Sequence, residues 1–237
     1  MKKTGFSAIE TSLCLALFLI ILLAAYEAFG ITKDFFFRFK KAEEENQTAM
    51  AALDKMRIDL LRAGSGLLPL IRMEAVEGIA MANNALIISS GEKTFSLLAD
   101  IPEGQASLSV ETTAGLSPGR EVSVFDEAKA EIKTISSIDG ESILLTSPLE
   151  ASYSMNETRV VLLEKTALFL DEKTCSIRRK VNASPAQPLL EDVLYFEFVY
   201  EKESNLAKLG FALKNNKEKK HELWVYPKNI ALACTKP

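Results

Sequence analysis

The sequence predicts an α+β protein, in which one long N-terminal helix packs on an antiparallel β-sheet that carries a β-rich insertion. Three observations lead to this fold class. An apolar run occupies much of the first thirty residues, residues 31–63 contain no glycine or proline, and short strand-like segments separated by turn residues fill the rest of the 237-residue chain. A helical segment followed by a series of strands is typical of this class.

The apolar run extends from Leu13 to Ala25 without a charged residue, glycine or proline, and the apolar-rich segment 6–30 holds 25 residues. A helix of about 20 residues crosses the roughly 30 Å hydrocarbon core of a bilayer. Lys2 and Lys3 precede the run and few basic residues directly follow it. This asymmetry predicts a single-pass membrane anchor with its N-terminus in the cytoplasm and its C-terminal domain on the other side of the membrane.

The same helix is expected to continue to residue 63, because residues 31–63 are rich in good helix formers. Apolar residues at three- and four-residue spacing predict a face that packs on a globular domain, namely Ala49, Leu53, Met56, Leu60 and Ala63. Segment 64–69 ends the helix with two glycines and a proline. The chain has no proline before Pro69, so we expect either a straighter helix or a bend at Gly30.

Residues 64–237 predict a globular β-rich domain, with a small barrel-like insertion at about 103–165. A hairpin is expected upstream, with its turn at Ser90-Gly91-Glu92. The expected strands are Ala85–Ser89, Thr94–Leu98, Ser107–Thr112, Glu121–Asp126, Ala130–Ile135, Ser142–Thr146, Arg159–Glu164, Thr166–Asp171, Ser176–Val181, Val193–Glu201, Lys208–Leu213 and Leu223–Tyr226.

Two common interpretations of the N-terminal segment leave features unexplained. A cleaved secretory signal needs small residues at −3 and −1 beyond the apolar run, and the stretch 24–28 offers no good pair. A plain signal anchor does not account for Glu10, because a carboxylate at this depth costs a few kcal/mol unless a partner neutralises it.

The segment from Lys2 to Glu10 resembles the class III leader of type IV prepilins. In that family a short basic leader ends in glycine, prepilin peptidase cuts after it, and the new N-terminal residue, usually phenylalanine, is N-methylated. The matching residues are Gly5 and Phe6, and Glu10 matches the glutamate at the fifth mature position. The resemblance implies a leader at 1–5 and a helix at 6–63, of which 6–30 form the membrane anchor and filament core. It also implies that Glu10 pairs with the N-terminal amine of a neighbouring subunit, which neutralises both charges.

The later part of the chain is similar in texture to the W-type minor pilins and J-type pseudopilins. The similar segments are the helix end at 60–64 and the stretch 187–193, which leads into the aromatic strand 195–200. The resemblance implies three kinds of partner besides the membrane: prepilin peptidase, other pilin or pseudopilin subunits that bind through the N-terminal helix, and the inner-membrane assembly platform. Many pilins have a proline near the membrane exit, and this chain departs from that pattern.

The expected function is therefore that of a minor pilin in type IV pilus assembly, with adhesion, motility and DNA uptake left open as roles of the exposed domain. A pseudopilin of a type II-like secretion system is the alternative within the family. An alternative of another class is a membrane-tethered binding or sensor domain, for which the leader match would be accidental.

The three cysteines differ in context. Cys14 lies in the apolar run, where it can act as a small hydrophobic residue. Cys175 and Cys234 lie in the part expected to be exported, where the pair can oxidise to a disulfide. Such a bridge would close a loop of about 60 residues and contribute roughly 4 kcal/mol. The alternative is two buried free thiols.

Residues that would carry catalysis or hold a cofactor are sparse, so we expect a protein that is not an enzyme and has no cofactor or metal site. The one histidine, His221, lies in a lysine-rich stretch and is expected to be a solvated surface residue. The formal net charge of −4 gives no general attraction to nucleic acid. Two basic clusters, 178–180 and 214–221, are expected to be solvated hairpins or loops.

Overall fold

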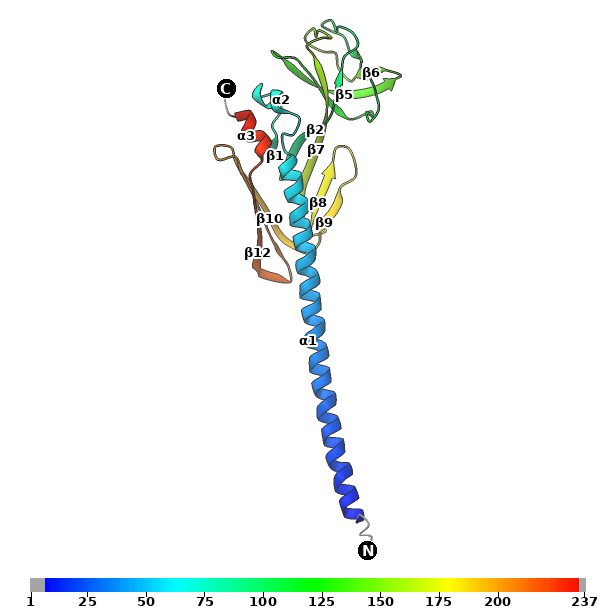
Figure 1. Ribbon diagram of the computed structural model, residues 1–237, viewed down its shortest axis with the longest axis vertical. Helices are drawn as coiled ribbons and strands as arrows, with labels where there is room; N and C mark the ends of the chain where they lie inside the picture. The colour runs from blue at the N-terminus through cyan, green and yellow to red at the C-terminus, as the bar shows by residue number, and fades with distance from the viewer. Residues whose placement is uncertain (1–6, 235–237) are drawn as a thin grey trace, which may run out of the picture. The chain divides into compact units, whose positions relative to one another are not determined.

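The computed structural model describes the backbone of residues 7–234 and the side chains of residues 7–233 (Figure 1). The chain contains two compact units, Met1–Met50 and Ala51–Pro237. Helix α1 spans Ala8–Arg62, and antiparallel strands dominate the second unit. The predicted α+β class and the long N-terminal helix are therefore confirmed.

In the first unit, α1 runs through Gly30 without interruption. The large apolar side chains of this unit are exposed over most of the helix, for example Ile9 at 81%, Phe29 at 67% and Phe35 at 71%. Within residues 7–234, α1 is the one helix long and apolar enough to cross a membrane.

In the second unit, the last turns of α1 bury an apolar stripe. Leu53, Met56 and Leu60 are at most 7% exposed, as their spacing predicts. The helix ends before Gly64, which has φ +73° and donates its N–H to the Ser89 carbonyl at 2.8 Å. A short helix, α2 (Leu68–Arg72), follows, with Pro69 in its first turn. This helix is not predicted by the sequence pattern, since only five residues form it.

The larger sheet has nine strands, and all its pairings between named strands are antiparallel. Its main path runs β1-β2-β7-β4-β5-β6-β3, and β8 joins β7 to β9. The bounds are β1 Ile79–Ala82, β2 Ala85–Ser96, β3 Ser107–Ser109, β4 Glu121–Phe125, β5 Ala130–Asp139, β6 Ser142–Leu145, β7 Arg159–Asp171, β8 Ser176–Val181 and β9 Gln187–Leu190.

Strand β7 organises this sheet. One edge of β7 pairs with β2 over nearly its whole length, while the other edge pairs first with β4 and then with β8. Strands β3 to β6 and the first part of β7 surround a separate apolar core, whose fully buried members include Leu108, Val110, Val124 and Ile143. The strands predicted within 107–164 are therefore present and share a core.

The predicted hairpin at 85–98 is wrong. Residues 85–96 form one strand, β2, which pairs with β7 on both sides of a register shift between Gly91 and Lys93. Gly91 packs closely against Leu67 and Val161, where a Cβ would lie 3.1 Å from the Val161 Cγ1 atom. The glycine therefore marks a β-bulge and a close approach to neighbouring side chains, not a turn.

A second, three-stranded sheet follows in the order β10-β11-β12, with bounds β10 Val193–Glu201, β11 Leu206–Leu213 and β12 Asn216–Val225. Helix α3 (Lys228–Cys234) comes after β12 and packs beside α2 (Figure 1). The C-terminal tail expected from the sequence is thus partly helical.

His221 is buried, so its prediction as a surface residue is wrong. It is 7% exposed and stacks on its cross-strand neighbour Phe211, with ring centroids 5.1 Å apart. Burial lowers the pKa of His221, and the nearby Lys219 lowers it further. The alternation of side chains along β12 places His221 on the buried face, although the two residues before it are exposed lysines and the residue after it is an exposed glutamate.

Arg179 also departs from the prediction of a solvated basic cluster. Its guanidinium makes two hydrogen bonds with the carboxylate of Asp59 on α1, Nε to Oδ2 at 2.6 Å and Nη2 to Oδ1 at 2.9 Å. Asp59 is only 3% exposed. The hydrogen bonds to Asp59 raise the pKa of Arg179. This bidentate pair joins the end of α1 to β8.

We expect Arg179→Ala to destabilise the fold by about 3 kcal/mol, because it leaves the Asp59 carboxylate buried without its principal partner. The matched control is Arg178→Ala in the same strand, whose partner Asp171 is better exposed. That control should cost at most about 1 kcal/mol. Urea unfolding of the full chain in detergent checks both values, and equal costs for the two variants would contradict the structural role of the Asp59–Arg179 pair.

Candidate functional site

The predicted processing residues Gly5 and Phe6 lie outside the described residues. Glu10, the predicted assembly residue, lies in the first turn of α1 and is exposed. Its Oε2 accepts a hydrogen bond from the Ser7 N–H at 2.9 Å, and its own N–H donates to the Ser7 Oγ at 3.3 Å. The two residues therefore form a reciprocal N-terminal cap of the helix.

This cap is a function of Glu10 that the sequence interpretation missed. The signal was available, because serine followed three residues later by glutamate is the pattern of a capping box. The cap involves Oε2 of the carboxylate, and the side chain is exposed. An anion in the first turn is also stabilised by the partial positive charge of the helix N-terminus. The cap thus holds the Glu10 carboxylate in an accessible position at the start of the apolar helix.

A cluster of four phenylalanines, Phe35, Phe36, Phe37 and Phe39, follows the most apolar part of α1, and each ring is at least 55% exposed. The Phe36 and Phe37 rings meet edge to face at 6.0 Å, and the Lys33 Nζ atom lies 6.0 Å from the Phe37 centroid. Aromatic rings beside lysine are typical of the membrane–water interface. These residues extend the exposed apolar surface of the first unit beyond residue 30.

The predicted Cys175–Cys234 disulfide is wrong for this structure. Cys175 has a free thiol, which donates to the Glu172 carbonyl at 3.4 Å. Its backbone lies at the Leu213 end of β11, whereas α3 follows the opposite end of the three-stranded sheet. Six residues of strand separate those ends by about 20 Å, and a disulfide needs Cα atoms within about 7 Å. Cys14, the other cysteine in question, is exposed on α1.

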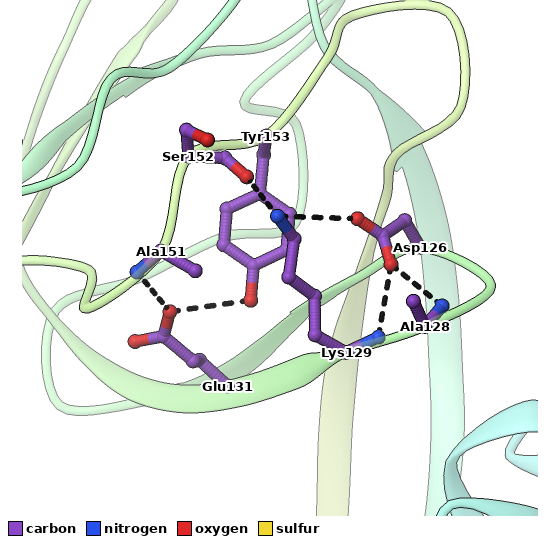
Figure 2. Close-up of polar contacts among 7 residues, drawn as sticks. All are labelled: Asp126, Ala128, Lys129, Glu131, Ala151, Ser152 and Tyr153. Atoms are coloured by element: carbon purple, nitrogen blue, oxygen red, sulfur yellow. Dashed lines mark hydrogen bonds and ion pairs between the residues drawn. The ribbon is translucent and has the colours of Figure 1, made fainter.

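A polar cluster in the β-rich insertion holds the segment 150–153 against β5 (Figure 2). Glu131 accepts hydrogen bonds from the N–H groups of Glu150 at 2.8 Å and Ala151 at 2.9 Å, and from the Tyr153 hydroxyl at 3.2 Å. The Lys133 Nζ lies 3.1 Å from the same carboxylate. The sequence interpretation did not identify this cluster, because its partners are about twenty residues apart.

A second lysine completes the cluster. Lys129 donates to the Ser152 carbonyl, lies 3.7 Å from Asp126, and stands 4.9 Å from the centroid of the Tyr153 ring (Figure 2). Asp126 in turn accepts the N–H groups of Ala128 and Lys129 at 2.8 and 2.9 Å. Each charged group thus faces a fixed partner of opposite charge or a hydrogen-bonding group.

The electrostatics of this cluster favour a fixed protonation state. Burial alone would raise the pKa of Glu131, but the two backbone N–H donors and Lys133 lower it overall. The same carboxylate raises the pKa of Lys133 against the opposing effect of burial. Burial first, and then the charge of Glu131, raises the pKa of Tyr153. Glu131 therefore stays ionised and Tyr153 stays protonated near neutral pH, which suits a structural clasp better than proton transfer.

Among the side chains of residues 7–233, no group of three or more His, Cys, Asp or Glu side chains could hold a metal ion.

No protein-family model and no curated protein matches the chain. Partial structural similarity is found to phage tailspikes. The Gp54 tailspike of Acinetobacter baumannii bacteriophage AP22, solved with a capsular saccharide, is 17% identical with a TM-score of 0.29, and the match covers 33% of this chain and 15% of the tailspike. The gp61 tailspike of Pseudomonas phage phi297 is 17% identical with a TM-score of 0.27, over 30% of this chain and 14% of the tailspike.

The Glu131 clasp predicts a specific pH dependence of stability. We expect Glu131→Gln to lower the free energy of unfolding by about 1–2 kcal/mol at pH 7. Because the folded pKa of Glu131 lies below its ordinary value of 4.5, its contribution is fully present above that value and is lost as the pH falls through the folded pKa. The difference between the two proteins should therefore shrink below about pH 4.5.

Denaturant unfolding at a series of pH values measures this difference. Glu127→Gln is the matched control, since Glu127 is exposed and lies in the same turn between β4 and β5. A wild-type advantage over Glu131→Gln that persists unchanged at pH 3 would contradict the assigned role of the ionised carboxylate.

Proposed function

We propose that the chain is a minor pilin subunit of a type IV pilus. It is made as a prepilin, held in the inner membrane by α1, cut by prepilin peptidase after Gly5 and N-methylated at Phe6. It then enters the filament, where α1 contacts other subunits. The protein is a substrate of the processing enzyme and acts by assembly, without catalysis of its own.

The observation that carries this proposal is the exposed apolar surface of α1. Between Ile9 and Phe39 the helix presents large apolar side chains, and Glu10 is capped in its first turn. Monomeric soluble proteins rarely expose so large an apolar surface, so this segment requires a membrane or a protein partner. A prepilin helix uses both in succession, first the bilayer and then the helices of neighbouring subunits.

The capped glutamate supports the same proposal. A carboxylate at the start of an otherwise apolar helix is costly in a membrane or filament core unless a positive charge meets it. The N-terminal amine that forms on cleavage after Gly5 supplies such a charge in a neighbouring subunit. Assembly then removes both charges from an apolar environment.

A pseudopilin of a type II-like secretion system is the second candidate. The segment 187–200, which resembles both the W-type minor pilins and the J-type pseudopilins, forms β9 and β10 in the structure and does not separate the two candidates. Both candidates require the same processing, so the first experiment tests them together.

Processing predicts a defined N-terminus. In cells that contain prepilin peptidase, the most N-terminal peptide should begin at N-methylated Phe6, and in cells without the peptidase residues 1–5 should remain attached. Mass spectrometry of the purified protein from both strains measures this. An intact leader in both strains would contradict the pilin function and favour a signal-anchored binding or sensor domain.

The charge of Glu10 can be separated from its capping role. Glu10→Gln keeps a side chain that can still accept the Ser7 N–H hydrogen bond, but it removes the negative charge. We expect its incorporation into filaments to fall at least about tenfold, because a lost charge pairing of about 1.4 kcal/mol corresponds to a factor of ten. Ser7→Ala removes its side-chain cap, at about 1 kcal/mol, and leaves the carboxylate in place. Immunoblots of sheared filaments compare the two. Equal incorporation of Glu10→Gln and the wild type would show that the charge is not required.

A further inference from the structure

A groove of about 840 Å³ lies in the second unit beside the start of α2. Its lining includes apolar side chains, among them the buried Phe125 and Val161, and the exposed carboxylates Glu127 and Glu157. Asp126 also lines the groove but is already paired with Lys129, and Arg159 is the one basic residue among the lining residues identified. The groove therefore presents two exposed carboxylates, Glu127 and Glu157, beside one arginine over an apolar floor.

A basic hairpin tip lies elsewhere in the same unit. Strands β11 and β12 are joined by a two-residue turn between Leu213 and Asn216. Residues 214–220 are all exposed and contain four lysines and one glutamate, Glu218, which gives a net charge of +3. Long lysine stems can cover apolar surface while their charged ends reach carboxylates at a rim.

The groove and the hairpin tip lie at opposite ends of the three-stranded sheet. The tip is at the Leu213 end of β11, whereas Ala207 at the other end pairs with Val225, after which the chain continues into α3. Helix α3 packs beside α2 (Figure 1). Leu68 and Pro69 of α2 line the groove. A chain cannot reach its own groove with this hairpin, so any contact between them joins two molecules.

We propose that the groove binds the β11–β12 hairpin tip of a second copy of this chain. The charges are complementary in sum: the tip carries a net charge of +3, and the groove presents the exposed carboxylates Glu127 and Glu157 beside Arg159. The contact is heterologous, since two different surfaces meet, and a pair of copies keeps one unused groove and one unused tip. Contacts of this kind close into rings or extend into open-ended assemblies.

This inference deepens the assembly function proposed above and rests on it for its biological meaning. The contact adds a link between globular units to the one that α1 makes through its apolar surface. It depends on neither cleavage after Gly5 nor the charge of Glu10, and that independence allows the two proposals to fail separately.

The test uses charge exchange between two variants of the full chain in detergent at low ionic strength. Glu127→Lys with Glu157→Lys makes the groove basic, and Lys217→Glu with Lys219→Glu makes the tip acidic. Each variant alone should self-associate with a dissociation constant at least about tenfold above that of the wild type. An equimolar mixture should associate again, because the basic groove of one variant then meets the acidic tip of the other.

Sedimentation velocity over a concentration series measures these constants, with the same detergent and salt throughout. The control is Glu103→Lys with Glu141→Lys, which changes the net charge equally at exposed positions outside the identified groove lining and should associate like the wild type. The wild-type association should also weaken as salt is added, since exposed charge pairs are screened.

Two results would overturn the proposal. One is a wild type that shows no concentration dependence beyond that of the groove variant. The other is loss of association in both variants without recovery in the mixture, which would mean that another molecule or another surface fills the groove. Neither result would bear on the N-terminal mass at Phe6, and an unprocessed leader would leave the charge-exchange result unaffected.

Discussion

The constraint with the widest consequences is that the apolar side chains of α1 between Ile9 and Phe39 must leave water. Each large aliphatic or aromatic side chain gains about 1.5–3 kcal/mol when it is fully withdrawn. The described part of the first unit is one helix and offers no core to supply that burial. The surroundings must supply it, and under the proposed function the membrane does so first and the helices of neighbouring subunits do so afterwards.

The second unit is constrained differently, because it holds charged side chains in sites that are poorly solvated. Asp59 is almost fully buried on α1 and is neutralised by Arg179, which β7 positions through its pairing with β8. Glu131 is satisfied in the insertion by backbone N–H groups and Lys133. Breaking either arrangement leaves a charge without its partner in a poorly solvated site, so both act as structural fixtures. The stability of the unit thus depends on partners that are distant in the sequence.

Sequence patterns predicted the features that depend on local chemistry. Helix formers without glycine or proline defined α1, and turn residues separated the strands of the insertion. The Ser7–Glu10 cap is local too, and its spacing was sufficient to predict it. The predictions that were wrong concern residues whose environment depends on tertiary neighbours. His221, predicted to be solvated, stacks on Phe211 across strands, and Arg179, also predicted to be solvated, binds the carboxylate of Asp59, 120 residues away. Gly91 led to the prediction of a turn, but in the structure it lies at a bulge in β2, where the absence of a side chain allows close packing against Leu67 and Val161.

A contact between an acidic groove and a basic hairpin tip would be weak by itself, because exposed ion pairs contribute about 0–1 kcal/mol each and are screened by salt. A weak contact between globular units is sufficient if α1 already provides the first contact between subunits. When α1 already holds two copies in one membrane or filament, the contact between globular units becomes effectively intramolecular, and modest pairwise energies then add to the overall affinity. The apolar helix would provide the strength of such an assembly. The charged contact, which repels mismatched surfaces, would provide its register.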